Sequence, residues 1–169
     1  LKPRFIEANV QALGQLATEL REGPAVLVGF VRPSEKAVGR RVRNCLALLR
    51  GGEIAAESCK SLLPTYDVFD EHRYFEPADG ASVVELKSGG RIWRIGVTIC
   101  EDLWNDKQTL GHQLYEKSPI NELQKANVDF VVNASASPFT VGKQALRERL
   151  ARGQAKLLGR PIVYVNQVG

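Results

Sequence analysis

The stretch RIWRIGVTICEDLW, residues 91–104, decides how the rest of this sequence is interpreted. Its first nine residues are mostly apolar, which predicts a buried strand that ends directly at Cys100. Glu101 and Asp102 follow at once, and acidic residues are typical of the first turn of a helix. A buried strand followed by a helix is the basic unit of layered α/β proteins.

Outward from this stretch, strand and helix patterns alternate along the chain. Helices are expected over residues 4–21, 107–126 (interrupted near Pro119) and 143–158. Single buried strands are expected over 25–31, 128–134 and 160–169, the first of them covered on both faces. Hairpins are expected at 42–58 around Gly51-Gly52 and at 82–99 around Gly89-Gly90. The predicted fold class is therefore α/β with a mixed sheet.

Length and composition limit the function classes. The 169 residues suit one ordinary domain, and 44% hydrophobic with 25% charged residues is a globular composition. The net charge of +4 is spread along the chain, which gives little support to nucleic-acid or membrane binding. His72 and His112 are too far apart in sequence for a zinc site, so no metal is expected.

Three cysteines are too few for a disulfide scaffold. The first hairpin brings Cys45 and Cys59 to neighbouring positions on paired strands, although no bond between them is required. A reactive thiol without a disulfide framework suits a reducing cytoplasm. The chain also contains no methionine and begins inside a helical pattern, so we expect it to be a piece of a longer protein.

Residues 61–80, SLLPTYDVFDEHRYFEPADG, form a long irregular segment that is rich in aromatic residues. Loops of this length in a domain are usually functional or disordered, and the aromatic content favours a packed, functional loop. Packing is the more frequent role for Tyr66, Phe69, Tyr74 and Phe75, and a ligand-binding role is the alternative.

Cys100 is the leading candidate for chemistry. Ligand sites of α/β sheets lie at the carboxyl ends of strands, and backbone N–H groups at a helix start favour a thiolate. The alternative is a small buried apolar residue. Lys60, at the end of the first hairpin, is a candidate cation, although most such lysines are solvated. A dyad of Cys100 with His72 or His112 has no supporting pattern.

Three segments together resemble a known family. KSLLPTYDVFDEHRYFEP, GVTICEDLW and NASASPFTVGK resemble the nitrilase superfamily and, more narrowly, the glutaminase domains of bacterial glutamine-dependent NAD synthetases. The resemblance runs along essentially the whole chain. It implies a nitrilase-like α-β-β-α sandwich with mixed sheets, incomplete at both ends, with residues 1–169 as a single partial domain.

The resemblance also implies a Glu–Lys–Cys triad. Cys100 matches the nucleophile that forms a thioester with the glutamine side chain. Lys60 matches the lysine that stabilises the oxyanion, together with the backbone N–H at Glu101. The general base would be a glutamate upstream of the matched region, so we expect the isolated piece to lack glutaminase activity.

Substrate contacts follow from the same resemblance. Tyr66, Ser137 and Lys143 match positions that hold glutamine, and some relatives carry arginine where Lys143 stands. A lysine offers a point charge rather than a bidentate fork, so its contact geometry would differ. Without the resemblance, Ser137 is a turn cap, and Lys143 belongs to a solvated basic face with Arg147, Arg149, Arg152 and Lys156.

The implied function is hydrolysis of glutamine to supply ammonia for ATP-dependent amidation of deamido-NAD to NAD. ATP and Mg would bind a downstream synthetase domain, and no cofactor is expected within residues 1–169. The expected partners are L-glutamine, that synthetase domain and further copies of the chain, in the cytoplasm. The alternatives are a stand-alone nitrilase-type amidase for another small amide and a non-catalytic module of the same fold.

Overall fold

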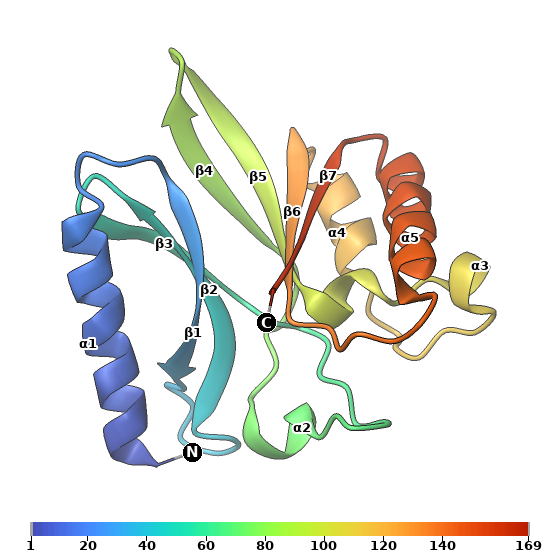
Figure 1. Ribbon diagram of the computed structural model, residues 1–169, viewed down its shortest axis with the longest axis horizontal. Helices are drawn as coiled ribbons and strands as arrows, with labels where there is room; N and C mark the ends of the chain where they lie inside the picture. The colour runs from blue at the N-terminus through green and yellow to red at the C-terminus, as the bar shows by residue number, and fades with distance from the viewer. Residues whose placement is uncertain (1, 169) are drawn as a thin grey trace. The chain divides into compact units, whose positions relative to one another are not determined.

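Two separate β-sheets organise the chain (Figure 1). The computed structural model describes residues 2–168, apart from the side chain of residue 108. The chain divides into two compact units, residues 1–78 and 79–169, and each contains one of the sheets.

The first unit is a three-stranded antiparallel sheet with one helix packed against it (Figure 1). Its main elements are α1 (Pro3–Glu19), β1 (Val26–Pro33), β2 (Val42–Arg50) and β3 (Glu53–Cys59). Leu13 and Ala17 are buried on the inner face of α1, four residues apart, as helical spacing requires. The helix, the strand and the hairpin predicted here are confirmed. The prediction that the first strand is covered on both faces is wrong, because within β1 only Phe30 is fully buried.

The hairpin of β2 and β3 places Cys45 directly opposite Cys59, with their Cα atoms 4.0 Å apart. The predicted proximity is confirmed. The structure goes further, because a disulfide joins the two residues. This disulfide removes the reason for expecting a reducing cytoplasm, which was the lack of disulfides.

The segment after β3 is irregular, as predicted, and contains one short helix, α2 (Glu71–Tyr74). Its first residues, Leu62 and Leu63, are buried. Tyr66 and Tyr74 are exposed, so core packing does not account for these two aromatic rings.

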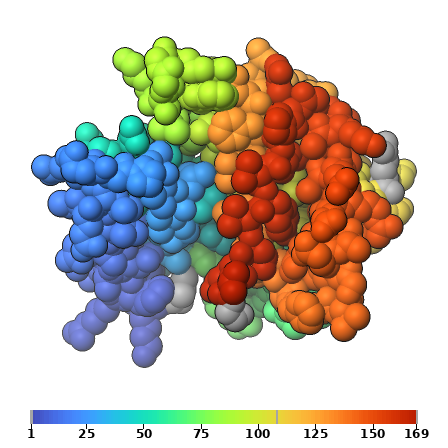
Figure 2. Space-filling model, turned by 45° about the horizontal axis from the view of Figure 1, so that its top comes forward, coloured from blue at the N-terminus to red at the C-terminus, as the bar shows by residue number. Residues whose placement is uncertain are grey.

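The second unit is a four-stranded sheet in the order β4-β5-β6-β7. The strands are β4 (Ser82–Ser88), β5 (Arg91–Ile99), β6 (Phe130–Ser135) and β7 (Ile162–Asn166). β4 is antiparallel to β5, whereas β5, β6 and β7 run parallel. Figure 2 shows β7, drawn in red, at the surface, where Val163 and Val165 are about half exposed.

Four helical segments accompany this sheet: η1 (Cys100–Leu103), α3 (Lys107–Leu110), α4 (Pro119–Lys125) and α5 (Lys143–Leu158). The core joins η1, α4, β6 and α5 through Leu103, Leu123, Val131 and Leu150. Gly96 in β5 permits the close approach of α4, because a Cβ at this position would lie 2.9 Å from Leu123 Cδ1. The helix predicted over 143–158 is confirmed.

The helix predicted over 107–126 is present at both ends, and the interruption predicted near Pro119 is confirmed but longer than expected, because it spans residues 111–118. Residues 111–118 form a loop because Asn105 bonds their backbone. Its Nδ2 donates to the carbonyls of Tyr115 (2.8 Å) and Lys117 (2.7 Å), and its Oδ1 accepts from the Leu114 and Tyr115 N–H groups. A side chain that bonds the backbone in this way competes with the helical pattern.

The predicted mixed α/β class is confirmed. The four-layer sandwich and the single-domain organisation stay predictions. Among the described residues, no helix is both long enough and apolar enough to cross a bilayer.

Asp129, just before β6, provides a test of how the second unit responds to pH. Its carboxylate accepts from the backbone N–H of Arg94 (2.8 Å) and from the Arg91 guanidinium (2.7 Å). These two contacts hold the pKa of Asp129 below its ordinary value. A carboxyl whose pKa falls on folding stabilises the fold above its unfolded pKa, and this contribution is lost as the pH falls through the folded pKa.

We therefore expect Asp129→Asn to lower the urea midpoint at pH 7 and to matter much less at a pH well below 3.8, because the wild-type carboxyl is protonated in the folded state only once the pH falls through its lowered pKa. Chemical unfolding at the two pH values tests this, with exposed Glu116→Gln as the control. Equal destabilisation by Asp129→Asn at both pH values would contradict it.

Candidate functional site

Cys100 lies where the chain turns sharply from β5 into η1. Its φ of 47° is in the left-handed region, which a residue with a Cβ seldom adopts. Backbone strain of this kind is characteristic of functional positions, because the surrounding structure must enforce it. Cys100 is a thiol rather than half of a disulfide, and it is partly exposed, so a small molecule can reach it.

Asn133 in β6 stabilises this turn through hydrogen bonds of its side chain. It is fully buried, and its Nδ2 donates to Thr98 Oγ1 (3.0 Å) and to the Cys100 carbonyl (3.4 Å). On the other side, Asp102 Oδ2 accepts from the Ile99 N–H at 3.0 Å. Asn133 was not assigned a role from the sequence, although an amide near the end of the mostly apolar strand VDFVVNA is a signal of one.

The segment after the nucleophile candidate is packed inward. The Glu101 side chain is buried, and Tyr115 donates its hydroxyl to Glu101 Oε1 at 3.2 Å. The carbonyl of Leu103 accepts from Gln154 Nε2 of α5 at 3.4 Å. These contacts fix η1 against its neighbours. The oxyanion role of the Glu101 N–H stays a prediction.

The loop that carries Ser137 follows β6, the strand beside β5. Ser137 is buried, and its N–H donates to Asn166 Oδ1 of β7 at 3.0 Å. Because β5, β6 and β7 are parallel, Cys100, Ser137 and Asn166 lie at the carboxyl edge of one sheet. Ligands of α/β sheets bind at this edge.

Lys143 opens α5 and is half-buried. Its Nζ lies 5.6 Å from the centre of the Trp104 ring, the residue that ends η1. The structure therefore brings Lys143 against the segment that begins with Cys100, with its charge beside an aromatic face.

Lys60, in the first unit, is 1% exposed and directly follows β3. Its Nζ donates to both carboxylate oxygens of Glu71, each at 2.7 Å. The backbone at Lys60 is fixed as well, because its N–H donates to the Asn44 carbonyl and its carbonyl accepts from the Ala78 N–H. A buried ammonium requires such a partner, so the solvated-lysine alternative is wrong.

Glu71 is a functional candidate that sequence reasoning did not single out. The signal was present, because Glu71 belongs to the Phe-Asp-Glu segment on which the resemblance partly rests. Tyr66 lies in the same irregular segment, and its ring packs edge-on against Phe69 at 6.0 Å. The site predictions thus fall into two groups: Lys60 and Tyr66 belong to the first unit, and Cys100, Glu101, Ser137 and Lys143 to the second.

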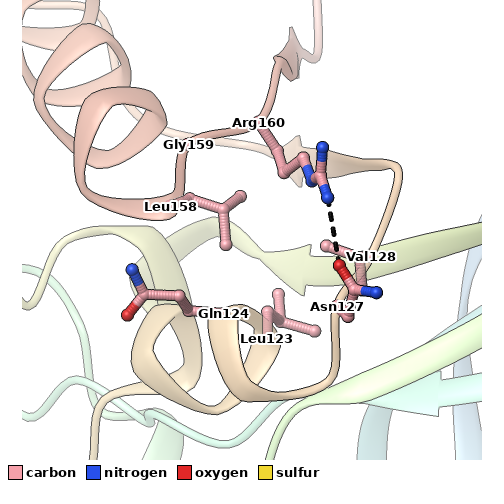
Figure 3. Close-up of a pocket in the computed structure, with 7 residues that line it drawn as sticks. All are labelled: Leu123, Gln124, Asn127, Val128, Leu158, Gly159 and Arg160. Carbon is pink, nitrogen blue, oxygen red and sulfur yellow. Dashed lines mark hydrogen bonds between the residues drawn. The ribbon is translucent and has the colours of Figure 1, made fainter.

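Two cavities of the second unit differ in their place on the sheet. One, of about 480 Å³, is lined at the carboxyl edge by the Ser137 loop, Arg147 and the end of β7. The other, of about 290 Å³, lies at the amino ends of β6 and β7 (Figure 3). Arg160 Nη2 there donates to Asn127 Oδ1 at 3.0 Å. Among the described residues, no cluster of three His, Cys, Asp or Glu side chains is suited to a metal ion.

Comparison with known proteins identifies relatives along the full chain. The carbon–nitrogen hydrolase family model matches residues 3–169. A glutamine-dependent NAD(+) synthetase of Synechocystis is 42% identical, and one of Thermotoga maritima is 36% identical. Each alignment covers all of this chain, but only 30% and 26% of the relative.

Solved structures agree with the sequence relatives. A glutamine-dependent NAD+ synthetase from Acinetobacter baumannii superposes with a TM-score of 0.73 and 32% identity, over 95% of this chain and 28% of that one. A carbon–nitrogen hydrolase from Helicobacter pylori has a TM-score of 0.69 over 99% of this chain and 56% of that one. Its 18% identity supports the shared fold alone.

The Lys60–Glu71 pair leads to a prediction about stability. Replacing Glu71 by Gln removes the counter-charge of a buried ammonium, which we expect to destabilise the fold by about 3 kcal/mol. Urea unfolding of the purified chain measures this. The control is Asp70→Asn in the exposed Asp70–Arg73 pair, 3.6 Å apart, where the change should stay below about 1 kcal/mol. Equal effects of the two substitutions would show that the buried charge is not held by Glu71.

Proposed function

Because this chain belongs to the carbon–nitrogen hydrolase family, we propose that it supplies Cys100 as the nucleophile for hydrolysis of the side-chain amide of glutamine, with a glutamate outside residues 1–169 as the general base. The observation that carries the proposal is the strained Cys100 turn at the same sheet edge as Ser137. The glutamine-dependent NAD(+) synthetases among its relatives support glutamine as the substrate and deamido-NAD as the ammonia acceptor.

The chemistry follows from what amide hydrolysis requires. The Cys100 thiolate attacks the amide carbon, and the C=O electrons move to the oxygen to give a tetrahedral oxyanion. When the carbonyl re-forms, the C–N bond breaks and ammonia leaves with a proton from a carboxylic acid, the base that first took the thiol proton. Water then adds to the thioester, which releases glutamate and restores the thiol.

Lys60 is suited to stabilise the oxyanion. Its ammonium is buried and held by two short hydrogen bonds to Glu71. A fixed charge in a water-poor environment needs little reorganisation when negative charge develops on the substrate. We assign the second oxyanion contact to the Glu101 N–H.

We assign substrate binding to three polar side chains. Lys143 supplies a cation for the substrate's carboxylate, and Ser137 and Tyr66 supply polar contacts. The chain spans about 30% of the length of its Synechocystis relative. We assign ATP, Mg and the amidation step to a synthetase domain of the same protein, which we expect to work as a homo-oligomer.

Cys100→Ala tests the proposal most directly. In the full polypeptide that carries this chain, we expect glutamine-dependent NAD formation to be abolished while formation from added ammonium salt persists, because the thiol acts only in ammonia release. Steady-state assays with each nitrogen source measure both rates, and the ammonia-dependent rate of the same variant serves as the control for folding. Equal loss with both nitrogen sources would remove Cys100 from the ammonia-supplying step.

Lys60→Ala tests the oxyanion assignment. Loss of one oxyanion donor costs about 3–4 kcal/mol of transition-state stabilisation, so kcat/KM for glutamine should fall by more than 100-fold. The ammonia-dependent rate of the same protein reports whether it is folded. A fall of less than tenfold would reduce Lys60 to a structural role.

A further inference from the structure

We propose that Arg147 is a positioning residue that holds the Ser137 loop in its substrate-binding conformation. This inference rests on the proposed function, because it assumes that Ser137 contacts the glutamine substrate. Arg147 lies on α5, one helical turn after Lys143, and reaches the loop that follows β6.

The contact is made with the backbone of the loop. Arg147 Nη2 donates to the Ser137 carbonyl at 2.9 Å and to the Pro138 carbonyl at 3.1 Å. One charged nitrogen therefore fixes two consecutive carbonyl groups. Hydrogen bonds from a charged donor are stronger than those between neutral groups.

Asn166 holds the same residue from β7. Its Oδ1 accepts from the Ser137 N–H at 3.0 Å, and its Nδ2 donates to the Ser137 carbonyl at 3.4 Å. The N–H and the carbonyl of Ser137 are thus both bonded, and Arg147 and Asn166 share the carbonyl. The backbone position of Ser137 is set by these two side chains.

The rest of the loop offers little support of its own. Pro138 and the three residues after it are exposed, and the Phe139 and Val141 side chains are 85% and 96% exposed. Burial of these side chains therefore does not hold the loop in place. The Thr140 carbonyl accepts from the Lys143 N–H at the far end of the loop. The bonds to Arg147 and Asn166 hold its beginning at Ser137 and Pro138.

The environment of Arg147 differs from that of its basic neighbours on α5. Arg149 and Arg152 are exposed, as a solvated face requires, whereas Arg147 is half-buried. Within the described part of the chain, its buried Nε has no hydrogen-bond partner. A buried donor without an acceptor is unfavourable, so the guanidinium is placed for its contacts with the loop at a cost to its own hydrogen bonding. The prediction that Arg147 belongs to the solvated basic face is therefore wrong.

The loop also borders a cavity large enough for a small ligand. Ser137, Phe139, Arg147 and Asn166 line the space of about 480 Å³ at the carboxyl edge of the sheet. Pockets for small molecules usually begin at about 300 Å³. Movement of the Ser137 backbone would change the wall of this space while leaving Cys100 in place.

The test uses Arg147→Gln and Arg147→Lys in the full polypeptide, with glutamine or ammonium salt as the nitrogen source. We expect Arg147→Gln to raise KM for glutamine by about 10- to 100-fold, the equivalent of losing one charge-assisted hydrogen bond, because the Gln amide can retain one of the two contacts. The kcat at saturating glutamine and the ammonia-dependent rate should change little. Arg147→Lys retains the charge but not the planar fork of the guanidinium, so its KM for glutamine should lie between those of the wild type and Arg147→Gln. Exposed Arg149→Gln is the matched control and should leave KM unchanged.

An unchanged KM in an Arg147→Gln protein that keeps its ammonia-dependent activity would overturn the proposal, whereas a parallel loss of kcat and ammonia-dependent activity marks a general folding defect. If Arg147→Gln does not fold, Arg147→Lys decides by the same criteria. Cys100→Ala separates the two hypotheses. If it still uses glutamine, the proposed function fails whatever Arg147 does, and if it uses only ammonia, an unchanged KM in the Arg147 variants counts against the positioning role alone.

Discussion

The second unit depends on one constraint, the reversal of the chain at Cys100. The residue adopts a left-handed backbone conformation that favours glycine, yet it carries a side chain. Asn133 bonds the Cys100 carbonyl and Asp102 bonds the Ile99 N–H on either side of the turn. The apolar core then anchors Leu103 immediately after it. These contacts together offset the strain and present the thiol at the carboxyl edge of three parallel strands.

In the first unit, the main constraint is a buried ammonium group, that of Lys60. Lys60 is held by Glu71 through its side chain and by Asn44 and Ala78 through its backbone. The two groups proposed for chemistry are thus each fixed by local contacts within their own unit. Such local order lowers the cost of aligning them with a substrate.

The sequence predicted the strands and the long helices well, because their apolar spacing is regular. It failed at residues 111–118, where Asn105 binds the backbone of a loop and overrides the helical pattern. The motif around Cys100 could be read from the strand and the residues after it. Glu71 and Asn133 each gave a sequence signal, but their partners and those of Arg147 could not be predicted, because a polar side chain's role depends on which backbone or charge the fold brings beside it. Periodicity identifies the faces of elements and leaves such pairings open.

One face of α5 carries Lys143, Arg147, Leu150 and Gln154, which reach Trp104, the Ser137 loop, the core and Leu103 in turn. The spacing of these four residues follows the helical repeat, so α5 fixes the relative positions of the groups that they contact. Inserting a single residue after Arg147 would rotate the part of α5 before the insertion by about 100° relative to the part after it. The contacts of Lys143 and Arg147 could then no longer form together with those of Leu150 and Gln154, although every side chain named here would still be present.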